Sequence, residues 1–354
     1  MTTPTVRPVR VATDFSQLVD TIQASGLLER RYGYYAIKIG SVVAAFVGLW
    51  VAFFLIGDSW AQLVVAAVLG LVLTHLAFLS HDAAHRQILK SASANEWLAV
   101  ALAGIGVGMS AAWWIRKHTK HHANPNTINR DPDIATTVIA FYPEPDRPRS
   151  RLVAFLIARQ GWWFFPILTV EGLNLHAQSM VTLFGNGPVK RRKTELGMVF
   201  SRWVVYLTAL FVMLSPGIAA AFLGVQLMVF GVYMGCTFAP SHKGMPVLPE
   251  DAKLDFFRRQ VLTSRNITGS QFMTFLMGGL NYQVEHHLFP SMPRPNLRHA
   301  QPMVKPFCAE RSVPYTETSL FTAYRIVVRY LNKVGLSARD PFQCPMVAGF
   351  RPRG

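Results

Sequence analysis

The chain is poor in cysteine, and the three cysteines that it contains lie far apart. Cys236, Cys308 and Cys344 are widely spaced and odd in number. An iron–sulfur cluster needs four thiolates, and a disulfide framework needs paired cysteines. We therefore expect neither in this chain, and we interpret all three residues as ordinary thiols.

Acidic residues are also scarce. Lys and Arg total 35 against 19 for Asp and Glu, so the formal net charge is +16 at pH 7. A charge of this size favours an anionic partner. Because 51% of the residues are apolar, we expect lipid head groups, CoA phosphates, or an acidic carrier or electron-donor protein, and no nucleic acid. The alternative is a positive excess on the cytoplasmic side of a membrane with no specific partner.

The N-terminus lacks the apolar run of a signal peptide, so cleavage of a leader is not expected. Apolar runs occur later, in two pairs that are each broken by a tiny turn. Each run is about long enough to cross a bilayer as a helix. The predicted spans are residues 39–56, 60–79, 199–214 and 218–238. They lie in a membrane domain at 39–300, between an N-terminal cytoplasmic or interfacial segment at 1–38 and a C-terminal cytoplasmic segment at 301–354. Residues 11–23 and 318–334 show the spacing of amphipathic helices.

Seven of the eleven histidines fall in three clusters beside or between these apolar runs. Residues three or four apart lie on one face of a helix, so each cluster can present its imidazoles to one side. Imidazole is the commonest transition-metal ligand, and the pattern therefore predicts a metal site. The clusters read HDAAH (His81, His85), HTKHH (His118, His121, His122) and QVEHH (His286, His287).

Basic residues flank the apolar runs, and neither tiny turn contains one. The positive-inside rule then puts the flanks and all three histidine clusters in the cytoplasm, and both turns outside. Two further apolar stretches, 98–114 and 152–175, would separate the clusters if either crossed the membrane, although hydropathy alone allows six spans. We interpret both as interfacial, re-entrant or buried. The predicted fold is an all-α integral membrane protein with four transmembrane helices in two hairpins and a cytoplasmic helical cap that carries the histidine clusters.

The histidine clusters alone do not identify the metal. Three or four imidazoles satisfy one tetrahedral zinc, whereas seven can surround two ions. Soluble di-iron bundles use Glu-x-x-His, which does not occur here. An all-imidazole pair of ions is the alternative, and iron is the candidate that activates oxygen without an organic cofactor. His176 lies on an apolar segment with two polar companions and is a candidate partner that orients a ligand, the alternative being ordinary buried hydrogen bonding.

Two other classes of protein use such residues. HDAAH resembles a shortened HExxH zinc-protease motif with Asp82 as the general base, but a protease leaves the other two clusters unexplained. A metal transporter or sensor would hold its ligands near the bilayer midplane, whereas these clusters lie at or beyond the ends of the apolar runs.

The ordered clusters resemble the three histidine boxes of the membrane fatty-acid desaturases, over residues 35–298. The second box is followed by Asn124-Pro125 and Asp131-Pro132-Asp133, and the third by Leu288-Phe289-Pro290. The resemblance implies two irons held by the box histidines on the cytoplasmic side of four spanning helices. It also implies one further histidine just after the last span, where His242 stands. The implied metal ligands are His81, His85, His118, His121, His122, His242, His286 and His287.

The third box begins with Gln283, as in the subgroup that includes front-end desaturases, whereas related acyl-CoA desaturases have histidine there. Gln283 is thus a candidate weak ligand, a partner of a bound water, or a residue that orients a neighbour. Many front-end relatives carry a fused haem domain with an HPGG motif, and no HPGG occurs here. We expect no haem in this chain and a separate electron donor of the ferredoxin, rubredoxin or reductase type. The basic run at residues 190–193 is a candidate docking site for an acidic donor.

The predicted function is oxygen-dependent desaturation of a long-chain fatty acyl group, carried by CoA, acyl-carrier protein or a lipid. A related hydroxylase, ketolase or acetylenase is the alternative. We expect a multi-pass protein of the bacterial plasma membrane, with both termini and the active site in the cytoplasm.

Overall fold

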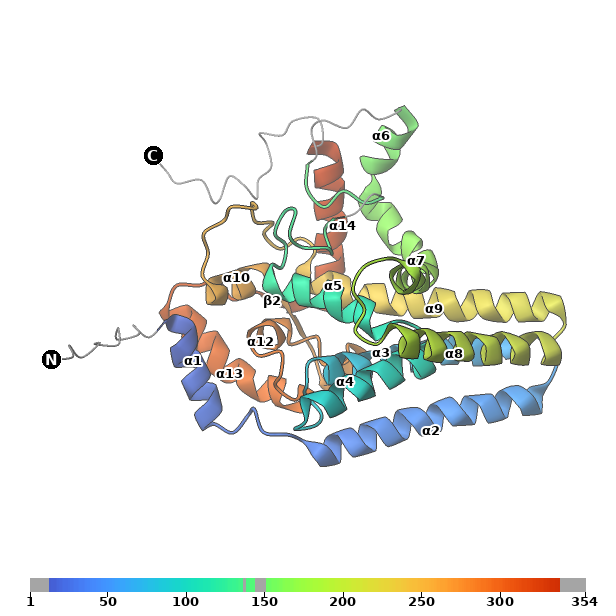
Figure 1. Ribbon diagram of the computed structural model, residues 1–354. Helices are drawn as coiled ribbons and strands as arrows, with labels where there is room; N and C mark the ends of the chain where they lie inside the picture. The colour runs from blue at the N-terminus through green and yellow to red at the C-terminus, as the bar shows by residue number, and fades with distance from the viewer. Residues whose placement is uncertain (1–12, 136–137, 144–150, 338–354) are drawn as a thin grey trace.

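The computed structural model describes residues 13–135, 138–143 and 151–337, and these residues are mostly helical (Figure 1). The prediction of a helical membrane protein is confirmed at this level. Two short strands among the described residues depart from the all-α prediction. The three-residue strand β1 (Asn266–Thr268) pairs in parallel with β2 (Glu317–Ser319), with Ile267 opposite Thr318.

Four helices are long and apolar enough to cross a membrane. In Figure 1 they extend together to the right of the molecule, where α3 packs against α2 and α9, and α8 packs against α9. The predicted stretches 39–56 and 218–238 lie within α2 and α9, whereas 60–79 starts two residues before α3 and 199–214 ends one residue after α8. Helices α2 and α8 begin earlier than predicted, and α3 and α9 run on to the histidines. The four are α2 (Tyr32–Ile56), α3 (Gln62–Ala84), α8 (Arg192–Met213) and α9 (Pro216–His242).

Both additional apolar stretches contain a sharp bend. Residues 98–114 are divided among α4 (Ala92–Ala101), the π-helix η1 (Leu102–Val107) and α5 (Ala111–Ala123), with a bend of 117° before α5. Residues 152–175 are divided between α6 (Arg151–Ile157) and α7 (Gln160–Phe184), which meet at 90°. Within the described residues, the candidate spans therefore number four, or six if each bent pair is one span.

The remaining helices gather beyond the other end of the four long ones. Helices α1, α10, α12 and α13 share an apolar core that includes Leu18, Phe257, Val284 and Leu297. They lie at the left of Figure 1, and α14 stands above them. The six helices are α1 (Asp14–Ala24), α10 (Phe256–Thr263), α11 (Gln271–Leu276), α12 (Gln283–Leu288), α13 (Arg294–Glu310) and α14 (Leu320–Ser337).

The predicted segment boundaries do not coincide with element ends. The boundary at 38/39 falls inside α2, and the boundary at 300/301 falls inside α13. Helix α1 packs on α13, the helix in which the predicted C-terminal segment begins. The amphipathic helices predicted at 11–23 and 318–334 correspond to α1 and α14. Residues 1–12 and 338–354, which include Cys344, lie outside the described residues.

Helix α7 crosses α9 at two glycines. A Cβ added at Gly231 would lie 2.3 Å from the backbone nitrogen of Gly172, so no larger side chain fits at this crossing. The close approach holds the bent α6–α7 pair against the helix that ends at His242.

Candidate metal centre

Four separate segments of the chain carry the candidate ligands. Helix α3 ends with His81 in its last turn and His85 as its C-cap. Arg86 then adopts a positive φ of 58°, and its backbone N–H donates to Ala83 O at 2.9 Å, which turns the chain away from the helix axis. Helix α9 ends at His242, while α5 and α12 carry the second and third clusters.

The start of α5 is fixed by a buried carboxylate from α8. Ser110 caps the helix by accepting from Trp113 N at 3.1 Å. Glu195 accepts from Ser110 Oγ at 2.5 Å and from Ala112 N at 3.2 Å. These contacts satisfy N–H groups that the first turn of a helix leaves unpaired, and they anchor the helix that presents the second cluster.

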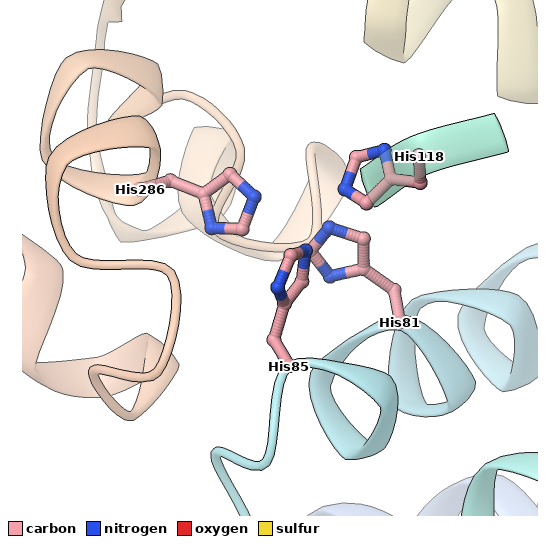
Figure 2. Close-up of side chains that lie close together, drawn as sticks. All are labelled: His81, His85, His118 and His286. Carbon is pink, nitrogen blue, oxygen red and sulfur yellow. The ribbon is translucent and has the colours of Figure 1, made fainter. Parts of the chain in front are cut away.

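Four imidazoles from three helices form the first histidine group: His81, His85, His118 and His286. One ring nitrogen of each lies within 4.8 Å of the corresponding nitrogens of the others. Figure 2 shows the rings of His81, His85 and His118 gathered opposite the ring of His286. Nitrogens about 2.1 Å from a shared ion lie up to about 4.2 Å apart, so the four need little movement to bind one ion.

His121, His242 and His287 form the second histidine group, again with ligand nitrogens within 4.8 Å of one another. The ring centroids of His121 and His242 are 4.6 Å apart, and those of His242 and His287 are 4.7 Å apart. All three residues are buried. The residue that the resemblance added to the boxes, His242, therefore lies beside ligands from the second and third boxes.

The second cluster is divided between the two groups. Its spacing predicted that all three imidazoles share one helix face, but His118 joins the first group and His121 the second. Three residues turn an α-helix by about 300°, so the two side chains diverge by about 60°. His122 lies between the groups, with its Nε2 2.9 Å from His118 Nε2 and its ring stacked 4.2 Å from His287.

Several of these nitrogens are buried without a hydrogen-bond partner among the described residues. They include both nitrogens of His286 and Nε2 of His81, His85 and His287. Burial lowers the pKa of His286 and His287 well below the usual range, which keeps both imidazoles neutral and able to bind metal. A buried polar atom without a partner is costly, so orphaned nitrogens in this number fit a metal centre better than a hydrogen-bonded core.

Two carboxylates lie directly behind the histidines. His121 Nδ1 is 3.0 Å from both oxygens of Asp131 and 3.5 Å from Asp133. These three residues also meet the geometric criteria for a metal site. The Asp131 carboxylate also accepts a hydrogen bond from the backbone N–H of Asn126 at 2.7 Å, which holds it in place and orients it toward His121.

Asp82 in the first box likewise lies beside a candidate ligand. Its Oδ1 lies 3.3 Å from His81 Nδ1, and its Oδ2 is 2.6 Å from the buried guanidinium of Arg294. Both oxygens therefore face protein groups.

Gln283 and His176, the two candidates outside the implied set of metal ligands, differ in position. Gln283 lies beside the second group, with its Nε2 2.9 Å from His242 Nε2 and its Oε1 buried without a partner among the described residues. His176 is elsewhere. Its Nδ1 is 2.7 Å from Gly172 O, its Nε2 is 3.3 Å from Val107 O, and its ring packs against Trp203. A neutral imidazole has one N–H, so one of these nitrogens donates to a backbone oxygen, as in ordinary buried hydrogen bonding. These contacts give His176 no link to a candidate ligand.

Sequence reasoning missed two residues that contact the ligands. Gln260 Oε1 lies 2.8 Å from His287 Nδ1, and the backbone oxygen of Thr263 lies 2.9 Å from His242 Nδ1. Both belong to α10, outside the boxes. A glutamine in a short amphipathic helix carries no spacing signal, and a backbone oxygen carries no sequence signal at all.

An apolar pocket lies beside the first group. Its lining includes His81 together with residues from α3, η1, α5 and α9. Trp114 lines the pocket and also stacks on His118, with ring centroids 4.2 Å apart. The pocket thus reaches the first group through one ligand and one indole ring.

Comparisons with known proteins identify related sequences. A family model described as fatty acid desaturase matches residues 58–319, which include all three histidine clusters. Delta(8)-fatty-acid desaturase 2 of Arabidopsis thaliana is 28% identical over 351 residues, spanning 93% of this chain and 76% of that protein. Delta(6)-fatty-acid desaturase fat-3 of Caenorhabditis elegans is 26% identical over 338 residues, spanning 92% and 75%. Fatty acid desaturase 3 of Bos taurus is 26% identical over 332 residues, spanning 91% and 73%.

Proposed function

The chain belongs to the fatty acid desaturase family and is therefore an oxidoreductase, and we propose that it uses dioxygen and a histidine-bound pair of iron ions to desaturate a long-chain fatty acyl group. The observation that carries this proposal is the convergence of two groups of buried, largely unpartnered imidazoles beside an apolar pocket.

The residues present fit two ions. The first histidine group would hold one ion and the second the other, with His122 within reach of both. When bound, the iron pair supplies the oxygen reduction and the hydrogen-atom abstraction that an unactivated methylene requires. The protein's part is to hold the ions, orient the acyl chain and exclude water.

Gln283 is a candidate fourth ligand of the second group. The amide oxygen and nitrogen of a glutamine exchange places by a rotation of the side chain, and the assignment follows from its partners. After such a rotation Oε1, which has no partner among the described residues, would face the space beside His242 Nε2. We propose that this oxygen binds the ion directly or through a water.

The pocket would hold the acyl chain. Its lining is almost entirely apolar, with Phe78, Phe230 and Met234 among its walls. Each methylene moved out of water contributes about 0.8 kcal/mol, so a long chain binds with ample free energy. Depth in the pocket relative to His81 would select the carbons that react, and Trp114 would shield the first group from water.

Removal of two hydrogen atoms and reduction of dioxygen to two waters require two electrons and two protons from elsewhere. We propose that a separate ferredoxin, rubredoxin or reductase supplies the electrons. The basic run at 190–193 is less available for docking than its sequence indicates. Lys190 and Arg191 contact Glu96, and Arg192 donates to backbone oxygens, including that of Leu183 at 2.6 Å.

For the membrane topology, we propose four spans in two hairpins, with the histidines and both termini in the cytoplasm. The backbone N–H of Ser215 donates to Asp58 at 2.8 Å, which supports a common side for the two turns. The ligands stand at the opposite ends of α3 and α9. The 117° and 90° bends support re-entrant or interfacial segments. The relatives named above come from a plant and two animals, so the bacterial plasma membrane stays a prediction from sequence.

The contacts of Asp82 weaken the protease alternative. A general base needs an oxygen free to reach a water or the substrate, whereas both oxygens of Asp82 face His81 and Arg294. The metal-transporter alternative is weakened by the position of the ligands at helix ends, away from the middle of the long helices.

The test is expression with a matched electron donor, followed by mass spectrometry of the cellular acyl chains and iron analysis of the purified protein. We expect a product that has lost two hydrogen atoms, and about two irons per chain. His118→Ala serves as the inactive control. A product that has gained oxygen would make the protein a hydroxylase, and a protein that binds zinc but not iron would refute the proposed chemistry.

A further inference from the structure

Two imidazoles of the second histidine group are hydrogen-bonded on the side that faces away from the ion position. His121 Nδ1 lies 3.0 Å from Asp131, and His242 Nδ1 lies 2.9 Å from the backbone oxygen of Thr263. A backbone oxygen and an ionised carboxylate can only accept a hydrogen bond. Both Nδ1 atoms therefore carry the proton, and both Nε2 atoms present a lone pair to the ion.

Gln260 imposes the same tautomer on His287. Its Nε2 lies 3.0 Å from the backbone oxygen of His122, which can only accept, so the amide nitrogen must face that oxygen. The amide oxygen then faces His287 Nδ1 at 2.8 Å and accepts its proton. Gln260 is completely buried, and this one side chain joins the second box to the third.

The first histidine group has far fewer such contacts. His81 has one, to Asp82 at 3.3 Å, and that carboxylate is shared with Arg294. Within the described part of the chain, neither nitrogen of His286 has a hydrogen-bond partner, and the same is true of His85 Nε2. Nothing comparable to Gln260 fixes which nitrogen of His286 faces the ion.

We infer that the two ion positions are unequal, that the second histidine group holds its ion more tightly than the first, and that Gln260 is a positioning residue for it. A hydrogen bond to the distal nitrogen fixes the tautomer and ring orientation of a metal-binding histidine and raises its basicity. Loss of such a partner lowers metal affinity about 10- to 100-fold. The inference rests on the proposed function only in requiring two ions.

The first experiment uses the purified full-length protein loaded with ferrous iron and titrated with a chelator, with iron per chain and the Mössbauer spectrum as readouts. We expect two distinct iron signals and two steps of release, with one ion lost at a chelator concentration at least about 10-fold lower than the other. Release of both ions in a single step, with one common signal, would overturn the inference.

The second experiment compares three variants in the same titration. Gln260→Leu removes the acceptor for His287 and should weaken the tighter step about 10- to 100-fold while the looser step is unchanged. Gln260→Glu keeps an oxygen facing His287 but loses the donor to His122 O, so it should retain most of the tight binding. Gln62→Leu is the matched control, because Gln62 is also buried and donates to Phe53 O at 2.7 Å, at the start of α3. It should change neither step.

Equal weakening of both steps by Gln260→Leu, or of neither, would overturn the inference, as would a Gln260→Glu variant that behaves like Gln260→Leu. If Gln260→Leu does not fold, the inference is still tested by the Gln260→Glu variant and by the two-step release of iron from the parent protein. A protein that binds a single ion overturns both this inference and the ion pair in the proposed function. Two unequal irons without desaturase activity would overturn the proposed function alone.

Discussion

Helices α3 and α9 form an inner pair, and α2 and α8 form an outer pair. In the most apolar 18-residue stretch, 61% of the residues of α3 and 39% of those of α9 are buried, against 11% for α2 and 17% for α8. Both inner helices end in candidate ligands, and both line the apolar pocket. The outer helices contain no histidine. All four helices could cross a membrane, but only the inner pair supplies candidate ligands and pocket walls.

The largest expected effect is the loss of activity when a candidate ligand at the end of an inner helix is removed, compared with a change at the same end of an outer helix. His81→Ala on α3 and His242→Ala on α9 each remove a ligand, so turnover should fall to background and iron content should drop. Tyr32→Ala, at the corresponding end of α2 and 48% exposed, should leave both unchanged. Product analysis and metal analysis check this, and turnover retained in either histidine variant would remove that residue from the ligand set.

A second comparison tests packing with one leucine from each pair. Leu69 on α3 is 2% exposed and Leu55 on α2 is 82% exposed. Leu69→Ala leaves a cavity between protein helices and should lower the free energy of unfolding by about 2–3 kcal/mol. Leu55→Ala should change it by less than about 0.5 kcal/mol. Thermal unfolding in one detergent measures both, and similar losses would mean that α2 is as enclosed as α3.

A third comparison uses one glycine from each pair. A Cβ at Gly70 on α3 would lie 2.9 Å from the backbone oxygen of Gln226 on α9, whereas a Cβ at Gly48 on α2 meets nothing within 4 Å. Gly70→Leu should therefore cost about 1–3 kcal/mol through overpacking of α3 against α9. Gly48→Leu should be tolerated. Equal stability of the two variants would show that the inner helices can separate without loss.

The smallest expected effect concerns the hydrogen bond between the pairs. Tyr206 on α8 donates to Gln226 Oε1 on α9 at 3.1 Å, and both side chains are buried. Tyr206→Phe should destabilise by about 0.6 kcal/mol, the average for such bonds between membrane helices. The double variant Tyr206→Phe/Gln226→Met should lose less stability than the sum of the losses in the two single variants, because it leaves no acceptor unpaired. Strict additivity would show that the bond does not couple the pairs.

The sequence predicted much of the fold because its strongest signals are local. Apolar runs identify the long helices, and histidines at helical spacing identify the boxes. Local spacing fails where the answer depends on packing. It put His118 and His121 on one face, whereas a divergence of about 60° sends them to different groups.

The hydrogen-bond partners of the ligands were beyond sequence reasoning for a related reason. Gln260 is 27 residues from His287 along the chain, and Thr263 acts through its backbone. His176, by contrast, looked suitable in sequence because polar companions surround it, yet its ring nitrogens face the backbone oxygens of Gly172 and Val107. Only the packing of α10 and α7 distinguishes these residues.

The bond from Ser215 to Asp58 ties the two turns together at the end of the molecule farthest from the ligands. Helix α3 has 23 residues and is therefore about 35 Å long. Over that length, a change of one degree in helix tilt moves the far end by about 0.6 Å. A change in this surface hydrogen bond that alters the helix tilt would therefore displace His81 and His242 relative to each other at the opposite ends of α3 and α9.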